Sequence, residues 1–460
     1  MSRLAARWTK VATSFLPFAD AATPELPLGR LLRLSLFQLS CGMAAVLLTG
    51  TLNRVMIVEL GFPSLLVAAM VSIPLLFAPL RALIGHKSDH HRSVLGWKRV
   101  PYIWFGTLLQ FGGFAILPFA LLVMTGKGDG PAIFGEIFAV VGFLMIGAGM
   151  HSVQTAGLAL ATDLAPQESR PRVVALLYVM LLVGMLVSSL VIGGLLQDYS
   201  PTLLVQVIQG AGALTMVLNL IALWKQEARS PRAAADAPPA PDFRATWREF
   251  VSVPRHRRLL VAVGLGAAAF AMQDVLLEPF GGQVLGLGVG ATTVLTALWA
   301  TGTLGGLGLA AHLLAKDTDP HRLAGFGAVA GTFAFSLIIF AGAVVEPALL
   351  RAGAMVLGFG GGLFAVGTLT AAMGLASARG AGLALGAYGA VQATCAGVAI
   401  LVGGLLKDAV GAVSGASAGY STVYALEIAL LFITLVALGP LARRETDTTS
   451  GRFGLAEFPG

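Results

Sequence analysis

The sequence predicts an all-α protein that crosses a membrane about twelve times and consists of two six-helix halves. Of its 460 residues, 56% are hydrophobic and only 12% are charged, and the mean hydropathy is +0.83. Soluble domains keep roughly a quarter of their residues charged. Apolar runs long enough to cross a bilayer recur along nearly the whole chain. Because lipid offers backbone polar groups no partners, these runs must be helices.

The expected spans fall into two sets, and each span is long enough to cross about 30 Å of hydrocarbon at about 1.5 Å per residue. The first six lie near residues 32–53, 62–84, 101–125, 132–161, 172–196 and 202–224. The second six lie near residues 259–279, 290–315, 323–345, 350–376, 381–406 and 421–441. Cys41 and Cys395 both fall inside spans, so neither a disulfide framework nor a metal cluster is expected.

Polar segments before, between and after the spans divide the chain into five parts. We expect a cytoplasmic N-terminal segment at 1–30, a six-helix bundle at 31–224, a cytoplasmic linker at 225–257, a second six-helix bundle at 258–441 and a cytoplasmic tail at 442–460. Apolar residues of the N-terminal segment recur at helical spacing, which suits a short helix on the membrane surface and equally a mobile tail. The linker combines prolines with charges, which is typical of solvated segments.

The basic residues predict the orientation of the chain. If both chain ends are cytoplasmic, 26 of the 30 Lys and Arg residues lie on that side, and only Arg54, Lys127, Arg351 and Lys407 lie on the other. This asymmetry is the positive-inside pattern. The net charge of +7 therefore needs no nucleic-acid partner, because topology and attraction to anionic lipid account for the basic loops.

A faint internal repeat relates the two halves. Asn53 in the first span corresponds to Glu278 in the seventh, and both segments continue into exits that contain a glycine, Gly61 and Gly286. Together with the central linker, this repeat matches the six-plus-six arrangement of the major facilitator superfamily, whose halves are related as repeats.

The loop after the second span resembles the major facilitator motif between helices two and three. In that motif a glycine permits close backbone approach, and an acid and bases tie the ends of neighbouring helices together. A solvated basic loop that only sets the topology explains the same residues about equally well. The candidate motif residues are Gly85, Asp89, Arg92, Gly96, Trp97, Lys98 and Arg99.

Polar side chains inside spans are costly and are therefore functional candidates by default. Asn53 and Arg54 lie at the predicted end of the first span, near Glu59. Snorkelling of Arg54 to the headgroups is an equal alternative. His151 and Gln154 lie one turn apart on one face of the fourth span, where an interhelical hydrogen bond is the plainer interpretation.

A third group of polar side chains lies in the seventh span and contains Gln273, Asp274 and Glu278. The two carboxylates stand at positions i and i+4, so a continuous helix would place them on one face. They could serve proton coupling, face water at a helix end, or accept hydrogen bonds from Arg54 across the repeat.

Four glycines at GxxxG spacing lie in the eighth and tenth spans: Gly302, Gly306, Gly358 and Gly362. Close helix packing is the first explanation, and a flat apolar ligand against a small-residue surface is the second. The chain contains no phosphate loop, zinc-ligand spacing or nucleophile motif, so the sequence does not predict an enzyme or an ATP-driven pump.

Four stretches carry a more specific resemblance: Phe15–Ala21, Gly50–Gly61, Leu95–Tyr102 and Gln273–Gly282. They resemble the bacteriochlorophyll delivery family, the PucC and LhaA type of light-harvesting complex assembly proteins in purple phototrophic bacteria. That family is a branch of the major facilitator superfamily. The resemblance extends over residues 15 to about 440.

The resemblance implies an assembly factor that delivers bacteriochlorophyll to antenna α and β polypeptides, or holds these polypeptides during ring assembly, without being an enzyme. It also implies contacts with the reaction-centre core or bacteriochlorophyll synthase, and a place in the bacterial inner, intracytoplasmic photosynthetic membrane. Bacteriochlorophyll contains a magnesium ion that takes an axial nitrogen or oxygen ligand. His151, or a carbonyl or amide group, is the candidate ligand, and no protein-bound metal is expected.

Two other functions fit the same sequence. The main alternative is a proton-coupled secondary transporter of a small solute, with Arg54, Asp274 and Glu278 in the site. The other is a scaffold without a pigment site, in which glycine-rich faces pack against antenna helices. The identity of the client complex, core or peripheral antenna, is not specified by the sequence.

Overall fold

The computed structural model describes residues 23, 26–76, 97, 99–126, 131–166, 169–227, 252–374 and 381–442. Every regular element within these residues is a helix, and eleven of the helices are long and apolar enough to span a membrane. The second expected span, near 62–84, is described over Ser64–Leu76. The predicted fold class, an all-α multi-pass membrane protein of about twelve helices, is therefore confirmed.

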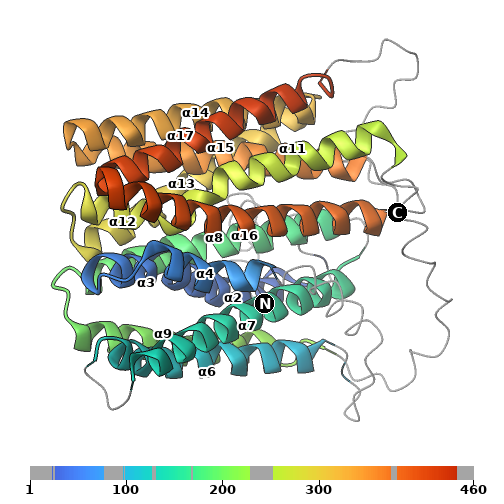
Figure 1. The fold of residues 1–460 in the computed structure, drawn as a ribbon. Helices are drawn as coiled ribbons and strands as arrows, with labels where there is room; N and C mark the ends of the chain where they lie inside the picture. The colour runs from blue at the N-terminus through green and yellow to red at the C-terminus, as the bar shows by residue number, and fades with distance from the viewer. Residues whose placement is uncertain are drawn as a thin grey trace, which may run out of the picture.

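The helices run side by side along one common direction (Figure 1). The first half contains α2 (Leu28–Val46), η2 (Leu47–Thr51), α3 (Leu52–Arg54), η3 (Val55–Glu59), α4 (Ser64–Leu76), α6 (Val100–Met124), α7 (Ala132–Leu164), α8 (Arg170–Leu195) and α9 (Pro201–Leu223). The second half contains α11 (Pro254–Ala271), η6 (Met272–Val275), α12 (Leu277–Gln283), α13 (Val289–Leu314), α14 (Pro320–Val344), α15 (Pro347–Gly374), α16 (Ala381–Ser414) and α17 (Ala416–Leu438).

We call the end of the bundle where α9 ends and α11 begins the linker end, and the opposite end the far end. The far end lies at the left of Figure 1, where α3 and α12 are found. The predicted surface helix of the N-terminal segment, the middle of the linker and the polar tail lie outside the described residues.

The first span is longer than the sequence indicated. It runs without interruption over Leu28–Glu59 rather than 32–53, because two short π-helical stretches, η2 and η3, continue the helix. Stretches of π-helix inside α-helices often occur at functional sites. Asn53 and Arg54 consequently lie inside the helix and not at its end.

The seventh span is broken. The α-helix of α11 ends at Ala271, a 3-10 turn follows in η6, and a helix resumes as α12 at Leu277. The prediction that Asp274 and Glu278 share one face of a continuous helix is therefore wrong, because the break falls between them. Irregular backbone at membrane depth is tolerated where protein surrounds it, and it is common at the binding sites of transporters.

The predicted repeat has a counterpart in the backbone. Gly61 follows the first span and Gly286 follows the seventh, with φ values of +69° and +68°. This left-handed region is open to glycine at no steric cost, and it is strained for most other residues. Both halves therefore turn out of their first helix by the same backbone conformation.

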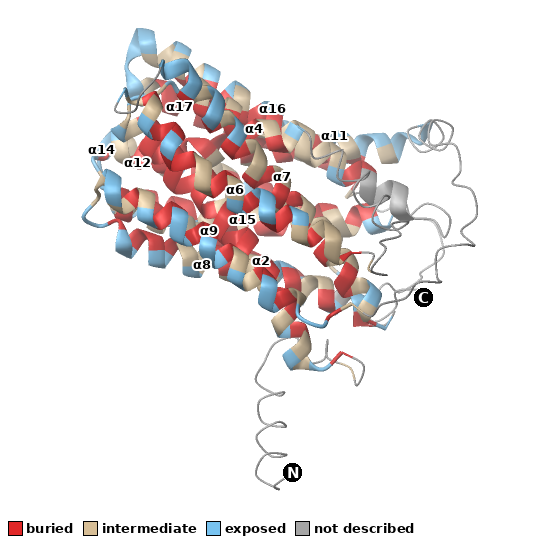
Figure 2. Cartoon of the chain, turned by 90° about the horizontal axis from the view of Figure 1, so that it is seen from below, coloured by how far each residue is buried: buried red, intermediate tan, exposed pale blue. Residues whose placement is uncertain are grey.

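The two halves meet along two pairs of helices, α4 with α16 and α8 with α13. Gly404 of α16 lies 2.8 Å, measured from its ideal Cβ position, from the carbonyl oxygen of Ser64, and Gly193 of α8 lies 3.0 Å from that of Gly290. Figure 2 shows buried residues through the middle of the bundle and exposed ones on its outside. Small residues thus let the halves approach backbone to backbone.

Within the second half, α13 and α15 pack closely through the predicted glycines. A Cβ at Gly302 would meet the carbonyl of Met355, and one at Gly358 would meet the carbonyl of Trp299. Gly306 and Gly362 face backbone atoms of the opposite helix in the same way. The backbone of the partner helix occupies these glycine surfaces, so they are not available to a flat ligand.

Gly302→Val should destabilise the protein by about 2 kcal/mol or more, because the new methyl groups meet backbone atoms that cannot turn aside. Gly308→Val is the matched control, since Gly308 lies on the same helix, is exposed and has no atom within 4 Å of its ideal Cβ position. The thermal unfolding midpoint of purified protein in detergent measures the difference. Equal midpoints for the two variants would contradict the packing described here.

Candidate functional site

Polar side chains of the first and seventh spans meet at the far end of the bundle. Asn53 is fully buried, and Arg54 and Glu278 are each 3% exposed. Two of the three come from the continuous first span, and the third comes from the short helix α12 beyond the break in the seventh. The structure thus brings together residues that are more than 200 positions apart in the chain.

Arg54 is held from both halves. Its Nη1 donates to Glu59 Oε1 at 2.8 Å, and its Nη2 donates to the carbonyl oxygen of Leu287 at 2.9 Å. The guanidinium lies against Gly282, where a Cβ would be 2.5 Å from Nε. Burial rules out the predicted alternative that Arg54 snorkels to the headgroups. Its bond to the second half goes to a backbone carbonyl and not to Asp274 or Glu278.

Asn53 and its neighbours close the far end. Asn53 Nδ2 donates to the carbonyl oxygens of Thr49, at 2.6 Å, and Asp274, at 3.2 Å. The second bond joins the first span to the 3-10 turn of the seventh. We call the hydrogen bonds between the halves at this end the far-end seal. The other members are Arg54 to Leu287, Thr51 with Thr293 at 3.3 Å, Gln283 Nε2 to Ile57 O at 3.4 Å and Leu65 N to Asp408 Oδ2 at 2.7 Å.

The two carboxylates of the seventh span have separate partners. Glu278 Oε1 accepts from the Thr296 hydroxyl at 2.6 Å and lies over Gly50, where a Cβ would be 2.5 Å away. Its Oε2 has no hydrogen-bond partner among the described residues. Asp274 is partly exposed and accepts from Gln273 Nε2 at 2.5 Å. The structure therefore does not form the coupled carboxylate pair that the i, i+4 spacing indicated.

Glu427 of α17 belongs to the site and was not predicted. It is fully buried, and its Oε1 accepts from the backbone N–H of Gln273 at 2.8 Å, at the break in the seventh span. Its Oε2 has no partner among the described residues. A single glutamate in an otherwise apolar span is a functional signal in its own right, and applying that rule to α17 would have found it.

His151 and Gln154 lie elsewhere. They belong to α7, whose far-end residue is Ala132, and His151 is about 28 Å along the helix from that end. Their neighbours contact α2 and α6, since the Cys41 thiol approaches the carbonyl of Met150 at 3.9 Å. His151 is 7% exposed. The structure does not bring this pair to the far-end seal.

The candidate loop motif is described only at Trp97 and Arg99. Arg99 Nε pairs with Asp163 Oδ2 at 3.0 Å, and the Arg99 backbone N–H donates to Glu227 at 3.1 Å. Val100 N–H donates to the same carboxylate at 2.9 Å. This arrangement joins the linker ends of α6, α7 and α9. The other predicted motif residues lie outside the described residues: Gly85, Asp89, Arg92, Gly96 and Lys98.

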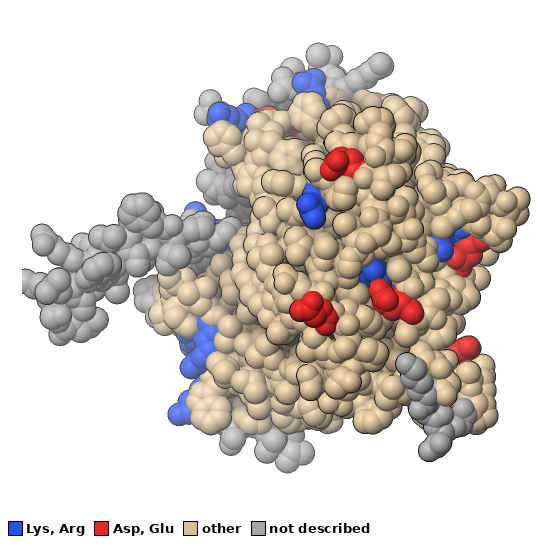
Figure 3. Space-filling model, turned by 90° about the vertical axis from the view of Figure 1, so that its left-hand side faces the viewer, with Lys and Arg blue, Asp and Glu red and all other residues tan. Residues whose placement is uncertain are grey.

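The face of the bundle at the far end carries few charges. Figure 3 shows scattered acidic and basic side chains on a surface that is otherwise uncharged. Tyr199, in the turn between α8 and α9, lies close enough to the Arg54–Glu59 pair to feel its charges. Burial, and next the Glu59 carboxylate, raise the pKa of Tyr199 above its ordinary value of 10.0, so the phenol stays neutral at physiological pH.

A sequence model of the family described as PUCC protein matches residues 51–446. The chain belongs to this family. The predicted resemblance is thereby confirmed. The PucC protein of Rhodovulum sulfidophilum is 56% identical over 425 residues, which cover 90% of this chain and 94% of that protein. A Rhodobacter capsulatus protein described as uncharacterized, in the puhA-bchM intergenic region, is 52% identical over 98% of each chain.

A more distant relative is a protein named bacteriochlorophyll synthase 44.5 kDa chain, from Rhodobacter capsulatus, which is 30% identical over 90% of this chain and 96% of its own length. Among solved structures, the nucleoside transporter NupG has a TM-score of 0.69 at 14% identity, covering 91% of this chain and all of that one. A bacterial homologue of the lysosomal transporter Spinster, inward-facing and occupied, has a TM-score of 0.67 at 15% identity, covering 90% and 96%. The PucC-family chain therefore has the major facilitator fold.

Arg54→Ala should lower the free energy of unfolding by about 2 kcal/mol, because the Leu287 carbonyl and the Glu59 carboxylate lose a charged donor in a buried position. Arg351→Ala is the control, since Arg351 lies exposed near the far end of α15. Thermal unfolding in detergent reports both. An equal loss of stability in the two variants would contradict a specific contribution of Arg54 to the far-end seal.

Glu427→Gln should be more stable than Glu427→Leu by about 1 to 2 kcal/mol, since the amide oxygen still accepts from Gln273 N–H and the leucine leaves that donor unpaired. Both replacements remove the charge, so the comparison isolates the hydrogen bond. The thermal unfolding midpoint again serves as the measurement. If the leucine variant is at least as stable, Glu427 does not cap the broken helix.

Proposed function

We propose that the chain is an assembly factor for a light-harvesting antenna complex of purple bacteria. In this role it delivers bacteriochlorophyll to antenna α and β polypeptides, holds these polypeptides while the ring is assembled, or does both. The observation that carries the proposal is the family match over residues 51–446, together with PucC relatives at 50–56% identity. The protein acts in the bacterial inner membrane, with both termini on the cytoplasmic side.

The names of the relatives support a pigment-related role. Proteins named PucC come from Rhodovulum sulfidophilum, Cereibacter sphaeroides and Rhodobacter capsulatus, and each is matched over at least 94% of its length. A further relative is named as a chain of bacteriochlorophyll synthase. Relatives with these names would not be expected for a transporter of small solutes. Partners of the proposed factor are the antenna polypeptides, the reaction-centre core and the synthase.

The outside of the bundle supports the handling of apolar cargo. On α14, Phe326, Phe333 and Phe340 are 56%, 59% and 55% exposed and recur every seven residues, so they form one aromatic stripe along the helix. Large aromatic surfaces bind flat apolar groups and apolar helices by burial and ring contact. A pigment with a hydrocarbon tail, or a single antenna helix, would meet such a surface directly from the bilayer.

The fit of the pigment to His151 is poor in this structure. A magnesium ligand for a flat macrocycle must present its ring nitrogen at an open surface, and His151 is 7% exposed in the interior of α7. His151 is therefore not part of the proposed pigment site. When bound, bacteriochlorophyll supplies its own light-absorbing ring, and the contribution of this chain is to hold the pigment and exclude water.

One alternative has a structural observation in its favour. The fold is that of solute transporters, and Glu278 and Glu427 each keep one carboxylate oxygen without a hydrogen-bond partner among the described residues. Unpaired carboxylates beside a broken helix suit a proton-coupled site containing Arg54, Asp274 and Glu278. Against this alternative, Arg54 is already engaged by Glu59 and by a backbone carbonyl.

The decisive experiment is to replace the native relative in a purple bacterium with this chain carrying an affinity tag, and to purify it in mild detergent. We expect bacteriochlorophyll and antenna polypeptides to copurify, and His151→Ala to retain them. A strain without the protein should lose part of its near-infrared antenna absorption. The absorption band that is lost identifies the antenna complex that depends on the protein. Proton-dependent solute uptake with unchanged antenna spectra would overturn the proposal in favour of the transporter.

A further inference from the structure

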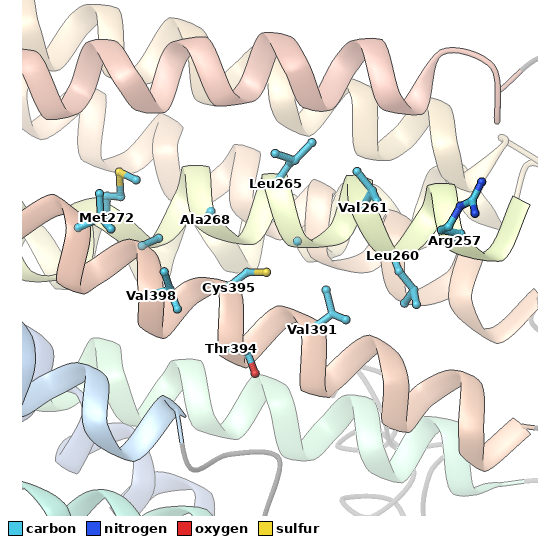
Figure 4. Close-up of a pocket in the computed structure, with 13 residues that line it drawn as sticks. Arg257, Leu260, Val261, Leu265, Ala268, Met272, Val391, Thr394, Cys395 and Val398 are labelled. Atoms are coloured by element: carbon cyan, nitrogen blue, oxygen red, sulfur yellow. The ribbon is translucent and has the colours of Figure 1, made fainter. Parts of the chain in front are cut away.

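An apolar groove runs along the side of the bundle between α11 and α16 (Figure 4). Its volume is about 540 Å³. Val261, Val398 and Val402 on its walls are 51%, 48% and 39% exposed, so the groove opens on the outer surface of the bundle. Figure 1 shows the two helices side by side at the front of the molecule. The other lining residues are Arg257, Leu260, Gly264, Leu265, Ala268, Met272, Val391, Thr394, Cys395 and Ala399.

A single charge stands at one end of this groove. Arg257 is the charged member of the lining, lies in the first turn of α11 and is exposed. Its side chain makes no hydrogen bond or ion pair within the described residues, whereas the side chain of its neighbour Arg258 donates to the carbonyl of Ala437. The groove therefore has an apolar length and a free cation at the linker end, where the basic loops place the headgroups of one leaflet.

The dimensions of the groove favour an alkyl chain over a helix as its occupant. From Arg257 to Met272 the groove follows α11 for about 22 Å. A helix about 10 to 12 Å wide fills roughly 2,000 Å³ over that length, so most of it would lie outside a groove of about 540 Å³. At the floor, Gly264 allows close approach of α16, since its ideal Cβ position lies 2.9 Å from the sulfur of Cys395. The groove is long and narrow, as an alkyl chain is.

The chemistry of the lining argues against the pigment ring. No histidine, carboxylate or amide side chain lines the groove, so a bound magnesium would find no strong axial ligand there. A macrocycle is also several times wider than an alkyl chain. The same lining suits a hydrocarbon chain, which needs apolar walls and no polar partners.

We propose that this groove binds an anionic phospholipid of the bilayer, with an acyl chain along α11 and α16 and the phosphate at Arg257. An arginine between helices at the headgroup level pairs with lipid phosphate, and the net negative charge of the lipid favours it over a zwitterionic lipid. This inference does not rest on the proposed function, because an assembly factor and a solute transporter would hold such a lipid equally well.

The test uses full-length protein purified in lipid nanodiscs and a photoactivatable phosphatidylglycerol that carries a diazirine in its acyl chain. We expect the cross-links to map to peptides of α11 and α16, and to be competed by unlabelled phosphatidylglycerol about fivefold more effectively than by phosphatidylcholine. Arg257→Gln should remove that preference. Arg322→Gln should retain it, since Arg322 is an exposed arginine at the linker end of α14, outside the groove.

A second variant separates the apolar part of the site from the charge. Ala268→Phe should fill the groove and lower cross-linking at α11 and α16 by tenfold or more, while the thermal midpoint confirms that the variant is folded. Cross-links spread evenly over the lipid-facing helices would overturn the proposal. It would also be overturned by equal behaviour of Arg257→Gln and Arg322→Gln, or by bacteriochlorophyll in place of lipid at these peptides.

Discussion

A hydrocarbon solvent leaves every buried polar group dependent on a partner inside the protein, and the far-end seal follows from this constraint. Arg54 lies within a helix that crosses the membrane, and its guanidinium would be very costly without Glu59 and the Leu287 carbonyl. The Leu287 carbonyl is available to it because the seventh span ends with α12 and the chain turns at Gly286. The turn after the seventh span and the charge in the first span are therefore joined by a hydrogen bond, which helps to fix how the halves meet.

Close packing of the rest of the bundle depends on small residues instead. Gly302 and Gly358 let α13 and α15 touch through their backbones, and Gly404 does the same between α16 and α4. These contacts gain dispersion energy without any hydrophobic driving force, which is weak between helices in lipid. The bundle thus combines close backbone contacts along its length with hydrogen bonds between the halves at the far end.

The sequence predicted the number of spans, their order and the two halves well, because hydropathy and length are strong constraints on membrane helices. It ended the first span at residue 53 because the charged pair Arg54 and Glu59 interrupts the apolar run, although a π-helical turn carries the helix past Arg54 and as far as Glu59. It placed Asp274 and Glu278 on one face because periodicity assumes an unbroken helix. At the break, the Gln273 N–H donates to Glu427, which lies 154 residues later in the chain, and local pattern does not reveal such a contact.

The close contact between Gly50 and Glu278 links the side chains that these two positions can hold. A Cβ at Gly50 would lie 2.5 Å from Glu278 Oε1, so the carboxylate from the other half of the molecule would have to shift. An alanine at position 50 would be accommodated only together with a shorter or displaced side chain at position 278. A substitution at either position therefore changes the space that the other side chain has, although the two positions lie in opposite halves of the chain.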